Sequence, residues 1–487
     1  MRNATRIDRI NSRNRIETER TGLRVADVPA ADQLEQQLPK IDPKIEFCNA
    51  QDDEHPAIHD FLVSVFQGPS SKQYRHTIEA PRYESLDRLL LKRHDEIVAH
   101  LQLVHRTIQF GDFRVPSIDI RHLGTLPEYR SKGLASRLLH HAEYDTNLHG
   151  ALLATVNATS PTYFLGRGWV PWMIHSESSA SPRSLLAELG LPSLNPTPEL
   201  RRSVNEDISI RLWRRHELDA LRRLFDSEKA TRYGGLARDE SDWNWLVSGK
   251  GYDRIYVAVR KSHQSTAMQL ISDSDDTVIM HSDEGDIIGY AVVRHDHIVE
   301  MIAEPETGAA VALLKHVCAD CIENGHSSVR IDAAPGDPVH DQFQAASGTH
   351  RQRQQRNGSM LLAKLIRPVE FLRRMSDVLL NRAVEQNLVL PQQLGIAIGP
   401  GDSARTVRIN LSKRSVNVVE GKLPTDCLTL DLQGFNMLLL GQANISELIK
   451  GQRAYATTRT ALDLGLALFP NLPGWRMPWE DLAPLER

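Results

Sequence analysis

The chain has 487 residues, of which 41% are hydrophobic and 25% are charged, and its formal net charge is −4 at pH 7. This composition is typical of a globular protein with about two to four domains. The slightly acidic balance argues against nucleic acid as a partner. Four cysteines are few for this length, which predicts a reducing compartment and a cytoplasmic protein. No apolar run approaches the about 18 residues of a membrane span, so we expect no membrane partner.

The N-terminal 43 residues are rich in Arg, Asn, Gln and Glu and lack hydrophobic periodicity. Seven arginines fall within the first 24 residues, but no apolar segment of a secretory signal accompanies them. A basic arm of this kind can touch nucleic acid, whereas its polarity favours a solvated chain. We therefore predict a disordered tail over residues 1–43.

An α+β pattern begins near residue 44. Strands are predicted over 45–48, 86–93, 96–110, 115–126 and 151–156, with a further short strand at Trp169. Helices are predicted over 55–66 and 131–148, with a helical turn over 161–168. An antiparallel meander followed by a strand–helix–strand unit indicates a mixed sheet with flanking helices. We assign residues 44–200 to this first domain, which ends in a Pro- and Ser-rich linker over 181–205 that contains one helical turn.

Two further segments follow the linker. Residues 201–366 repeat the order of strands and helices without similarity of residues, which suggests a duplicated fold. Within this segment, the acidic, Ser-rich loop over 261–285 and the basic loop over 350–359 are expected to be mobile. Residues 367–487 start a third pattern, with an amphipathic helix over 368–387, a hairpin across Ser412–Arg414 and several short helices.

The stretch "LPEYRSKGLASRLL" places a glycine where a predicted strand becomes a helix. The first turn of a helix has unpaired backbone N–H groups and a partial positive charge, which together favour an anion. Gly133 and the small Ala135 allow close approach of a ligand, and Arg130 and Lys132 add positive charge. The spacing fits a pyrophosphate site, and equally an ordinary helix start with a tight turn.

The longer stretch "LGTLPEYRSKGLASRLL" resembles the acetyl-coenzyme A motif of GNAT N-acetyltransferases, Arg/Gln-x-x-Gly-x-Gly/Ala after a strand. The later "YFLGRGW" is similar to the turn with a tyrosine and a Gly-aromatic pair in that family. The three-part layout resembles the Eis (enhanced intracellular survival) type. In that type, tandem GNAT folds, the second of them degenerate, precede a domain similar to sterol carrier protein 2. "GFNMLLLG" and "ALFPNLPGW" fit this third domain more weakly.

The resemblance implies acetyl-CoA as donor and a primary amine as acceptor, such as an aminoglycoside, a polyamine or a lysine. It assigns the pyrophosphate to the backbone of Arg130, Ser131, Lys132, Gly133, Leu134 and Ala135. It assigns the pantetheine arm to the strand residues Leu123, Gly124 and Thr125. In this fold two parallel strands separate at a bulge near this point, and the thioester lies between them. The resemblance also implies a homo-oligomer such as a hexamer.

The reaction needs an amine nucleophile, an N–H group for the oxyanion, a base for the ammonium proton and an acid for the thiolate. It needs no metal, and we assign none. Tyr163 is the candidate acid, because a phenol can donate a proton to a thiolate. The family tyrosine precedes the glycine of the Gly-aromatic pair by four residues, a position held here by Phe164. A small shift of the turn restores Tyr163, and a packing role is the alternative.

The candidate base is the C-terminal carboxylate of Arg487, by similarity to Eis-like enzymes. Those enzymes end in an aromatic residue, whereas this chain ends "PWEDLAPLER", so Glu480 and Asp481 are alternatives. Asp119 and His122, on the strand before the glycine turn, are further candidates.

Two other features are interpreted more simply. Cys318 and Cys321 lie on a predicted helix without a second Cys pair, which favours core packing over a metal site. The stretch "EPETGAAVAL" in the second segment puts acids where phosphate would lie, so we predict that this segment binds no CoA.

An alternative function for the whole chain is a CoA sensor without catalysis, or a lipid-binding protein that uses its third domain.

Overall fold

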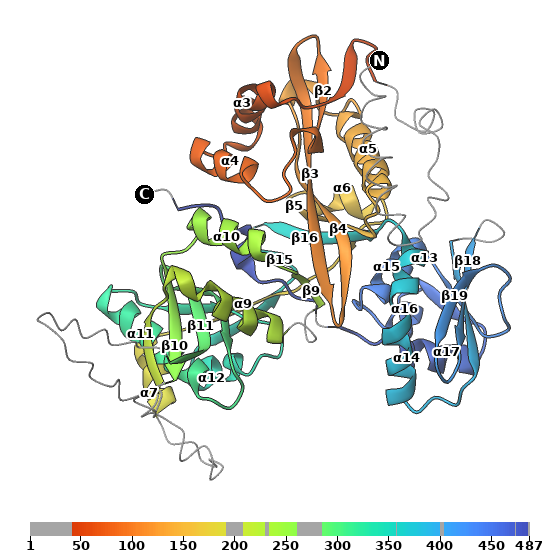
Figure 1. Ribbon diagram of the computed structural model, residues 1–487. Coiled ribbons are helices and arrows are strands. Elements are labelled where there is room, and N and C mark those ends of the chain that lie inside the picture. The colour runs from red at the N-terminus through yellow and green to blue at the C-terminus, as the bar shows by residue number, and fades with distance from the viewer. Residues whose placement is uncertain are drawn as a thin grey trace, which may run out of the picture. The chain divides into compact units, whose positions relative to one another are not determined.

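The computed structural model describes residues 41–190, 208–228, 233–260, 285–356, 358–399, 404–472 and 474–485 (Figure 1). These residues form two compact units. The first comprises Met1–Ile174, Arg232–Asp242 and Gln354–Arg476, and the second comprises His175–Thr231, Trp243–Arg353 and Met477–Arg487. The predicted tail up to residue 40, the linker beyond residue 190 and the loop over 261–284 lie outside the described residues.

The largest sheet belongs to the first unit, and its strands follow the predicted meander. The order is β1-β2-β3-β4-β5-β16-β15, with β6 beside β16 and β9 beside β3. Neighbours β1 to β4 are antiparallel, whereas β4 and β5 are parallel, so the predicted mixed sheet is confirmed. The strands are β1 (Ile45–Asn49), β2 (Arg88–Arg93), β3 (Glu96–Phe110), β4 (Phe113–Thr125), β5 (Leu153–Ala158), β6 (Val170–Pro171), β9 (Tyr233–Leu236), β15 (Gln355–Arg356) and β16 (Ser359–Leu365).

Helices cover both faces of this sheet. One face packs its alternate apolar residues, such as Leu89, Leu101 and Ile120, against α5 (Leu134–Leu148). The other face carries α3 (His55–Phe66) and α4 (Ser71–Ile78), whose apolar residues pack against Leu90. A short helix α6 (Pro161–Leu165) follows β5. Because successive strand residues point to opposite faces, this alternation places α3 and α5 on opposite sides of the sheet.

The second unit is built on a sheet with the order β14-β7-β13-β12-β11-β10-β8. Its strands are β7 (His175–Ala180), β8 (Ile208–Leu212), β10 (Arg254–Arg260), β11 (Asp286–Arg294), β12 (His297–Ala303), β13 (Val329–Asp332) and β14 (Thr349–Arg353). Its helices are α7 (Pro182–Gly190), α9 (Leu218–Ser227), α10 (Glu240–Gly249), α11 (Ala309–Glu323) and α12 (Val339–Ala345). Cys318 and Cys321 are buried on α11 in its apolar core, which confirms the packing interpretation.

The two sheets have the same order of strand directions, and each is completed by a strand from elsewhere in the chain. β13 pairs with β7 in the second sheet just as β5 pairs with β16 in the first, both antiparallel. Yet β7 follows the first meander in sequence, and β16 follows the second. The chain therefore exchanges one strand between the two sheets, which local sequence patterns do not indicate.

A third sheet, with the order β19-β18-β17-β20-β21, belongs to the first unit. Its strands are β17 (Gln392–Ile398), β18 (Arg405–Leu411), β19 (Val416–Glu420), β20 (Cys427–Leu430) and β21 (Ala454–Ala456). Its helices are α13 (Pro368–Arg374), α14 (Ser376–Glu385), α15 (Leu432–Leu439), α16 (Ile445–Lys450) and α17 (Arg459–Leu468). β18 and β19 form the predicted hairpin across Ser412–Arg414.

Two local predictions were wrong. The helix expected over 368–387 is divided at Met375 into α13 and α14, and Met375 is fully buried. The loop expected over 350–359 instead contributes the exposed edge strands β14 and β15. Polar edge strands are hard to distinguish from loops because solvent faces them on most sides. Among the described residues, no helix is long and apolar enough to cross a membrane.

Candidate active site

The parallel strands β4 and β5 separate along their length. They pair only from Ser117–Ile120 to Leu153–Val156. Beyond this point β5 pairs with β16 on its other side, and β4 continues to Thr125 while paired only with β3. In the described residues, the edge of β4 over 121–125 that faces away from β3 therefore has no strand partner. An edge of this kind can take an extended ligand as an added strand.

A bulge marks the point of separation. His100 pairs with Gly124 and Gln102 with Arg121, so two residues of β4 lie opposite one residue of β3. The extra residue places His122 in a left-handed conformation, with φ of 51°. This confirms the expected bulge beside the parallel strands. At Gly124, an added Cβ would lie 2.7 Å from Cζ of Phe66, so the glycine lets the end of α3 pack closely against this strand.

The turn between β4 and α5 has a concave backbone. Ser131 and Gly133 both adopt left-handed conformations, with φ of 62° and 82°. Gly133 is the N-cap of α5, and the first helical hydrogen bond runs from Arg137 N–H to the Gly133 carbonyl at 3.0 Å. The N–H groups that precede Arg137 thus come before the helical ladder. Alternating left- and right-handed residues gather such N–H groups into an anion-binding concavity.

Positive side chains border this concavity. Arg130, Ser131 and Lys132 are exposed, and Leu134 is buried in the core. The Lys132 ammonium lies 4.8 Å from the centre of the Tyr129 ring, and Arg130 Nε donates to the Thr125 carbonyl at 3.4 Å. The Tyr129 ring thus holds the Lys132 ammonium beside the turn, and the Thr125 carbonyl at the end of β4 holds the Arg130 guanidinium there. The predicted pyrophosphate residues are thus adjacent in space, and their charges suit a phosphate group.

Tyr163 points toward the first turn of α5. Its hydroxyl lies 3.1 Å from Ser136 Oγ, and Arg167 stacks on its ring with Cζ 4.0 Å from the ring centre. Arg167 also donates to Ser136 Oγ at 3.0 Å. Phe164, by contrast, is buried and packs edge-on against Trp169. Tyr163 is therefore the ring of this pair that shares a surface with the glycine turn.

The Gly168–Trp169 pair anchors the turn that carries Tyr163. Trp169 is fully buried and donates from Nε1 to Glu143 on α5 at 3.2 Å. Gly168 has φ of 83°, and an added Cβ would lie 2.9 Å from Leu432 at the start of α15. The buried amide of Asn436 donates to the Gly168 carbonyl at 3.0 Å and accepts from Leu365 N–H at 3.3 Å. Helix α15 thus positions the Tyr163 turn, a contact that no sequence motif indicated.

Asp119 and His122 have environments unsuited to a catalytic base. Burial opposes ionisation of Asp119, but Arg121, Arg476 and Arg106 outweigh it and lower the pKa of this carboxyl. Asp119 also accepts from Arg121 at 2.9 Å and from Thr155 at 3.0 Å. Burial and the charges of Arg88 and Arg121 lower the pKa of His122 to about 3. A base works best with a pKa near the working pH, so neither residue fits this role.

The remaining base candidates come from the C-terminus. Glu480 and Asp481 lie in a helical turn of the second unit, where Glu480 is buried next to Trp479. Trp479 packs edge-on against Trp243 and Tyr252. Trp243 is itself fully buried, so these aromatic residues belong to the core of that unit. Arg487 lies outside the described residues.

A buried hydrogen-bond chain reaches the β4 bulge from the α3 side of the sheet. Arg88 donates from Nε to the Tyr83 hydroxyl at 2.9 Å, and its Nη1 lies 3.1 Å from His100 Nε2. His100 Nδ1 lies 2.9 Å from the His122 carbonyl. A carbonyl only accepts and a guanidinium only donates, so His100 is neutral with its proton on Nδ1. Burial, reinforced by Arg88, lowers the pKa of His100 well below its usual range.

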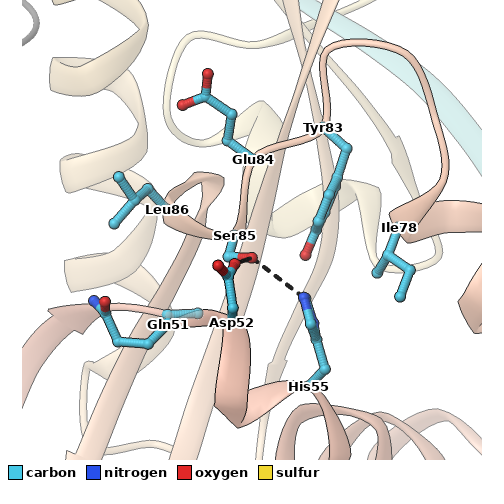
Figure 2. Close-up of a pocket in the computed structure, with 9 residues that line it drawn as sticks. Gln51, Asp52, His55, Ile78, Tyr83, Glu84, Ser85 and Leu86 are labelled. Carbon is cyan, nitrogen blue, oxygen red and sulfur yellow. Dashed lines mark hydrogen bonds between the residues drawn. The ribbon is translucent and has the colours of Figure 1, made fainter.

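Tyr83 also lines a cavity of about 530 Å³ next to the start of α3 (Figure 2). His55 Nε2 lies 3.2 Å from Ser85 Oγ, and Ser85 donates to Asp52 at 2.5 Å. Glu84 lies on the same wall. Burial and the Arg88 charge lower the pKa of His55, so its neutral form is favoured beside these carboxylates. The carboxylates in the lining favour a cationic ligand. The sequence alone did not predict this cavity.

The second unit contains a turn with left-handed residues at the same spacing. Glu306 and Gly308 have φ of 62° and 77°, and Gly308 is the N-cap of α11. β12 and β13 pair only over His297–Ile298 and Arg330–Ile331, so these parallel strands also separate. Thr307 Oγ1 donates to the Glu304 carbonyl at 2.8 Å and accepts from Ala309 N–H at 3.3 Å.

Comparison with known proteins agrees with this geometry. Residues 46–171 match the family model described as acetyltransferase (GNAT) domain. The chain therefore contains a GNAT acetyltransferase domain, and GNAT domains use acetyl-CoA as co-substrate. These findings support an enzyme of the N-acetyltransferase class. No match was found among curated proteins.

Solved structures share the fold of most of the chain at low sequence identity. A probable N-acyltransferase of unknown function from Enterococcus faecalis is 15% identical with a TM-score of 0.65, over 88% of this chain and 98% of its own. A GCN5-related N-acetyltransferase from Kribbella flavida is 15% identical with a TM-score of 0.64, over 89% and 97%. Eis1 from Mycobacterium abscessus is 14% identical with a TM-score of 0.60, over 88% and 99%.

Proposed function

We propose that the protein transfers an acetyl group from acetyl-CoA to a primary amine by direct attack of the amine on the thioester. The observation that carries this proposal is one juxtaposition in the first unit. The concave turn at Ser131 and Gly133 directly follows the strand edge that separates from β5. A pyrophosphate on the turn and a pantetheine arm along the edge of β4 would then form one continuous site.

The roles of the residues follow from this placement. The backbone from Arg130 to Ala135 binds the pyrophosphate, with the Arg130 and Lys132 charges beside it. The backbone of Leu123, Gly124 and Thr125 binds the pantetheine arm in the manner of an added strand. Acetyl-CoA supplies an acetyl group that is activated as a thioester. A backbone N–H on the free edge of β4 stabilises the oxyanion.

Proton transfers complete the reaction. The new C–N bond forms as the C–S bond breaks, so the ammonium must lose one proton and the thiolate must gain one. Tyr163 gives its phenolic proton to the thiolate and recovers one from solvent. The C-terminal carboxylate of Arg487 takes the ammonium proton. The carboxylates of Asp52 and Glu84 in the cavity beside α3 favour a cationic acceptor, such as a polyamine, an aminoglycoside or a lysine.

The layout of the chain supports the Eis type within this class. The first and second segments, 44–200 and 201–366, each contain a pair of parallel strands that separate, and among the described residues the basic turn belongs to the first segment. The third segment, 367–487, has its own five-stranded sheet and is proposed to resemble sterol carrier protein 2. A homo-oligomer such as a hexamer is part of this proposal, and light scattering measures its mass.

Release of free CoA thiol from acetyl-CoA with a panel of amines tests the activity. We expect amine-dependent release by the wild type, and none by Gly133→Glu, whose carboxylate would enter the anion site. Mass spectrometry of the amine product should show one added acetyl group. Tight acetyl-CoA binding without turnover on any amine would contradict the proposal and favour a CoA sensor.

A further inference from the structure

Two imidazoles and a carboxylate meet at the edge of the large sheet, in the region where β2 begins. Asp87 lies in the turn before β2, His105 lies on β3, and His149 follows the last turn of α5. The ligand atoms of these three residues all lie within 4.8 Å of one another. The three elements come together only in the folded sheet, and no part of the proposed acetyl transfer uses this cluster.

Asp87 is a buried carboxylate with little compensation. It is 4% exposed, and among the described residues the basic group that contacts it is His105 Nε2, 3.3 Å from Oδ1. A buried carboxylate is costly unless it is paired or coordinates a metal. Two ligands of a tetrahedral zinc ion with bonds of 2.0–2.1 Å lie about 3.3 Å apart. The separation of Asp87 from His105 is therefore that of two ligands of one ion.

His149 is oriented in the way that metal-binding histidines are. Its Nδ1 lies 2.8 Å from the backbone carbonyl of Asp145. Because a carbonyl only accepts, Nδ1 carries the proton, and the lone pair of the neutral ring is on Nε2. A backbone carbonyl that fixes the tautomer of a ligating histidine is a recurrent feature of metal sites. The His149 ring meets the His105 ring edge-on, with centres 5.0 Å apart.

We propose that Asp87, His105 and His149 bind one divalent transition-metal ion, with zinc as the reference ion and water as a further ligand. Two imidazoles and one carboxylate match the ligand preference of zinc and its neighbours rather than of magnesium or calcium. The metal binds the Nε2 lone pair of neutral His105, whose single proton then lies on Nδ1. The site joins the loop before β2, strand β3 and the end of α5.

The site is separate from the proposed CoA turn. Helix α5 has 15 residues and is about 22 Å long, with Gly133 at its start and His149 at its end. The ion therefore does not act as a Lewis acid in the acetyl transfer. Its role is structural, because it links the C-terminal end of α5 to the sheet. Loss of the ion should leave acetyl-CoA affinity unchanged.

Other candidate ligands in the described residues are less suitable. Glu177, His297 and Asp332 also lie close together in the second unit. There His297 lies 2.7 Å from Asp332, and the charge of Arg330 also acts on Asp332, so a protein cation already compensates this carboxylate. Burial raises the pKa of Cys318 to about 12 and of Cys321 to about 11, which keeps both thiols protonated and poor as ligands.

The test is zinc binding by the purified full chain, measured by equilibrium dialysis with metal analysis. We expect one tightly held zinc ion per chain, and at least tenfold weaker binding in His149→Gln and Asp87→Asn. The zinc affinity of His149→Gln is the decisive measurement, because Asp87 is buried and the Asp87→Asn variant could misfold. His295→Gln is the matched control, since His295 is 63% exposed and pairs with a single carboxylate, Asp253.

Thermal unfolding gives a second readout. Zinc should raise the melting temperature of the wild type and of His295→Gln, and leave that of folded His149→Gln unchanged. The proposal is overturned if the wild type retains no zinc, or if His149→Gln retains it as tightly as the control. Acetyl-CoA affinity, measured in parallel by calorimetry, distinguishes failure of this proposal from failure of the proposed function.

Discussion

The turns before α5 and α11 place left-handed residues in the same pattern but surround them with different chemistry. In each unit a left-handed residue stands two positions before a left-handed glycine that caps the helix. The first turn presents Arg130 and Lys132 to solvent, whereas the second places Glu306 there. Thr307 also accepts from the N–H of Ala309 at the start of the second helix. We therefore expect the first turn, and not the second, to bind an anion.

The strands before the two turns show a similar contrast. Both β4 and β12 carry a bulge and separate from a parallel neighbour. At the β4 bulge, His122 and the neighbouring His100 are polar, and Arg88 contacts His100. The residue added at the β12 bulge is Val299, which is fully buried. The second unit thus keeps the bulge and the separated strands but places an apolar residue where the first unit has His122.

The comparison is tested most strongly by placing a carboxylate in each turn. Gly133→Glu should weaken acetyl-CoA binding at least a hundredfold, or about 2.7 kcal/mol, because it adds negative charge and strains a left-handed position. Gly308→Glu is the matched control and should leave the affinity unchanged. Calorimetry with acetyl-CoA measures both. Equal losses in the two variants would show that the second turn also binds the ligand.

Tyr163→Phe tests the proposed acid. We expect kcat to fall ten- to a hundredfold with the KM for acetyl-CoA within twofold, since only the proton donor is lost. Ser136→Ala removes the hydroxyl that contacts Tyr163 while keeping the phenol, and should change kcat less than threefold. If both variants lose activity equally, the contact matters for structure and the acid lies elsewhere.

Acid pH should destabilise the protein through the histidines at the β4 bulge. The pKa of His122 is about 3 and that of His100 is also lowered, so the folded state binds fewer protons than the unfolded state below about pH 6.5. Stability is therefore lost as pH falls, by up to about 2 kcal/mol for each histidine between pH 6.5 and 5. Urea unfolding at the two pH values should show a smaller loss in His100→Gln. An unchanged loss would contradict the assignment of neutral histidines, and exposed His295→Gln is the control.

The smallest effects concern the charges beside the turns. Lys132→Ala and Arg130→Ala should each weaken acetyl-CoA binding three- to tenfold, and less at high salt, because both side chains are exposed. Thr307→Ala should leave acetyl-CoA binding unchanged and lower stability by about 0.5–1 kcal/mol through loss of the contact at the helix start. Salt-independent effects at Lys132 would contradict an electrostatic role.

Local features of the fold were predictable from the sequence. The bounds of β3, the hairpin of β18 and β19 and the glycine at the start of α5 follow from alternation and turn residues. The sequence pattern did not indicate β17 or the strand exchange, because alternation says that a segment is a strand and not which sheet it joins. The break at Met375 depends on burial in a core that only the tertiary fold creates.

The candidate site was predictable to a similar extent. The turn from Arg130 to Ala135 has a motif, and the structure brings these residues together with Tyr163 through Ser136. No sequence motif predicts the cavity beside α3 or the hydrogen bonds between Arg88 and His100. Both depend on the register between strands and on the loop before β2. His100 and Gln102 are polar and buried inside a largely apolar strand, and this signal could have pointed to the chain.

The exchanged strands have a consequence for how the chain is made. β5 receives its neighbour β16 only after the segment that forms the second sheet has been synthesised. During translation, the edge of β5 therefore remains open, and an open strand edge is prone to pair with other chains. A ribosome that stalls between the two segments would release an incomplete first sheet. Expression level and chaperone demand should thus depend on how quickly residues 359–365 emerge.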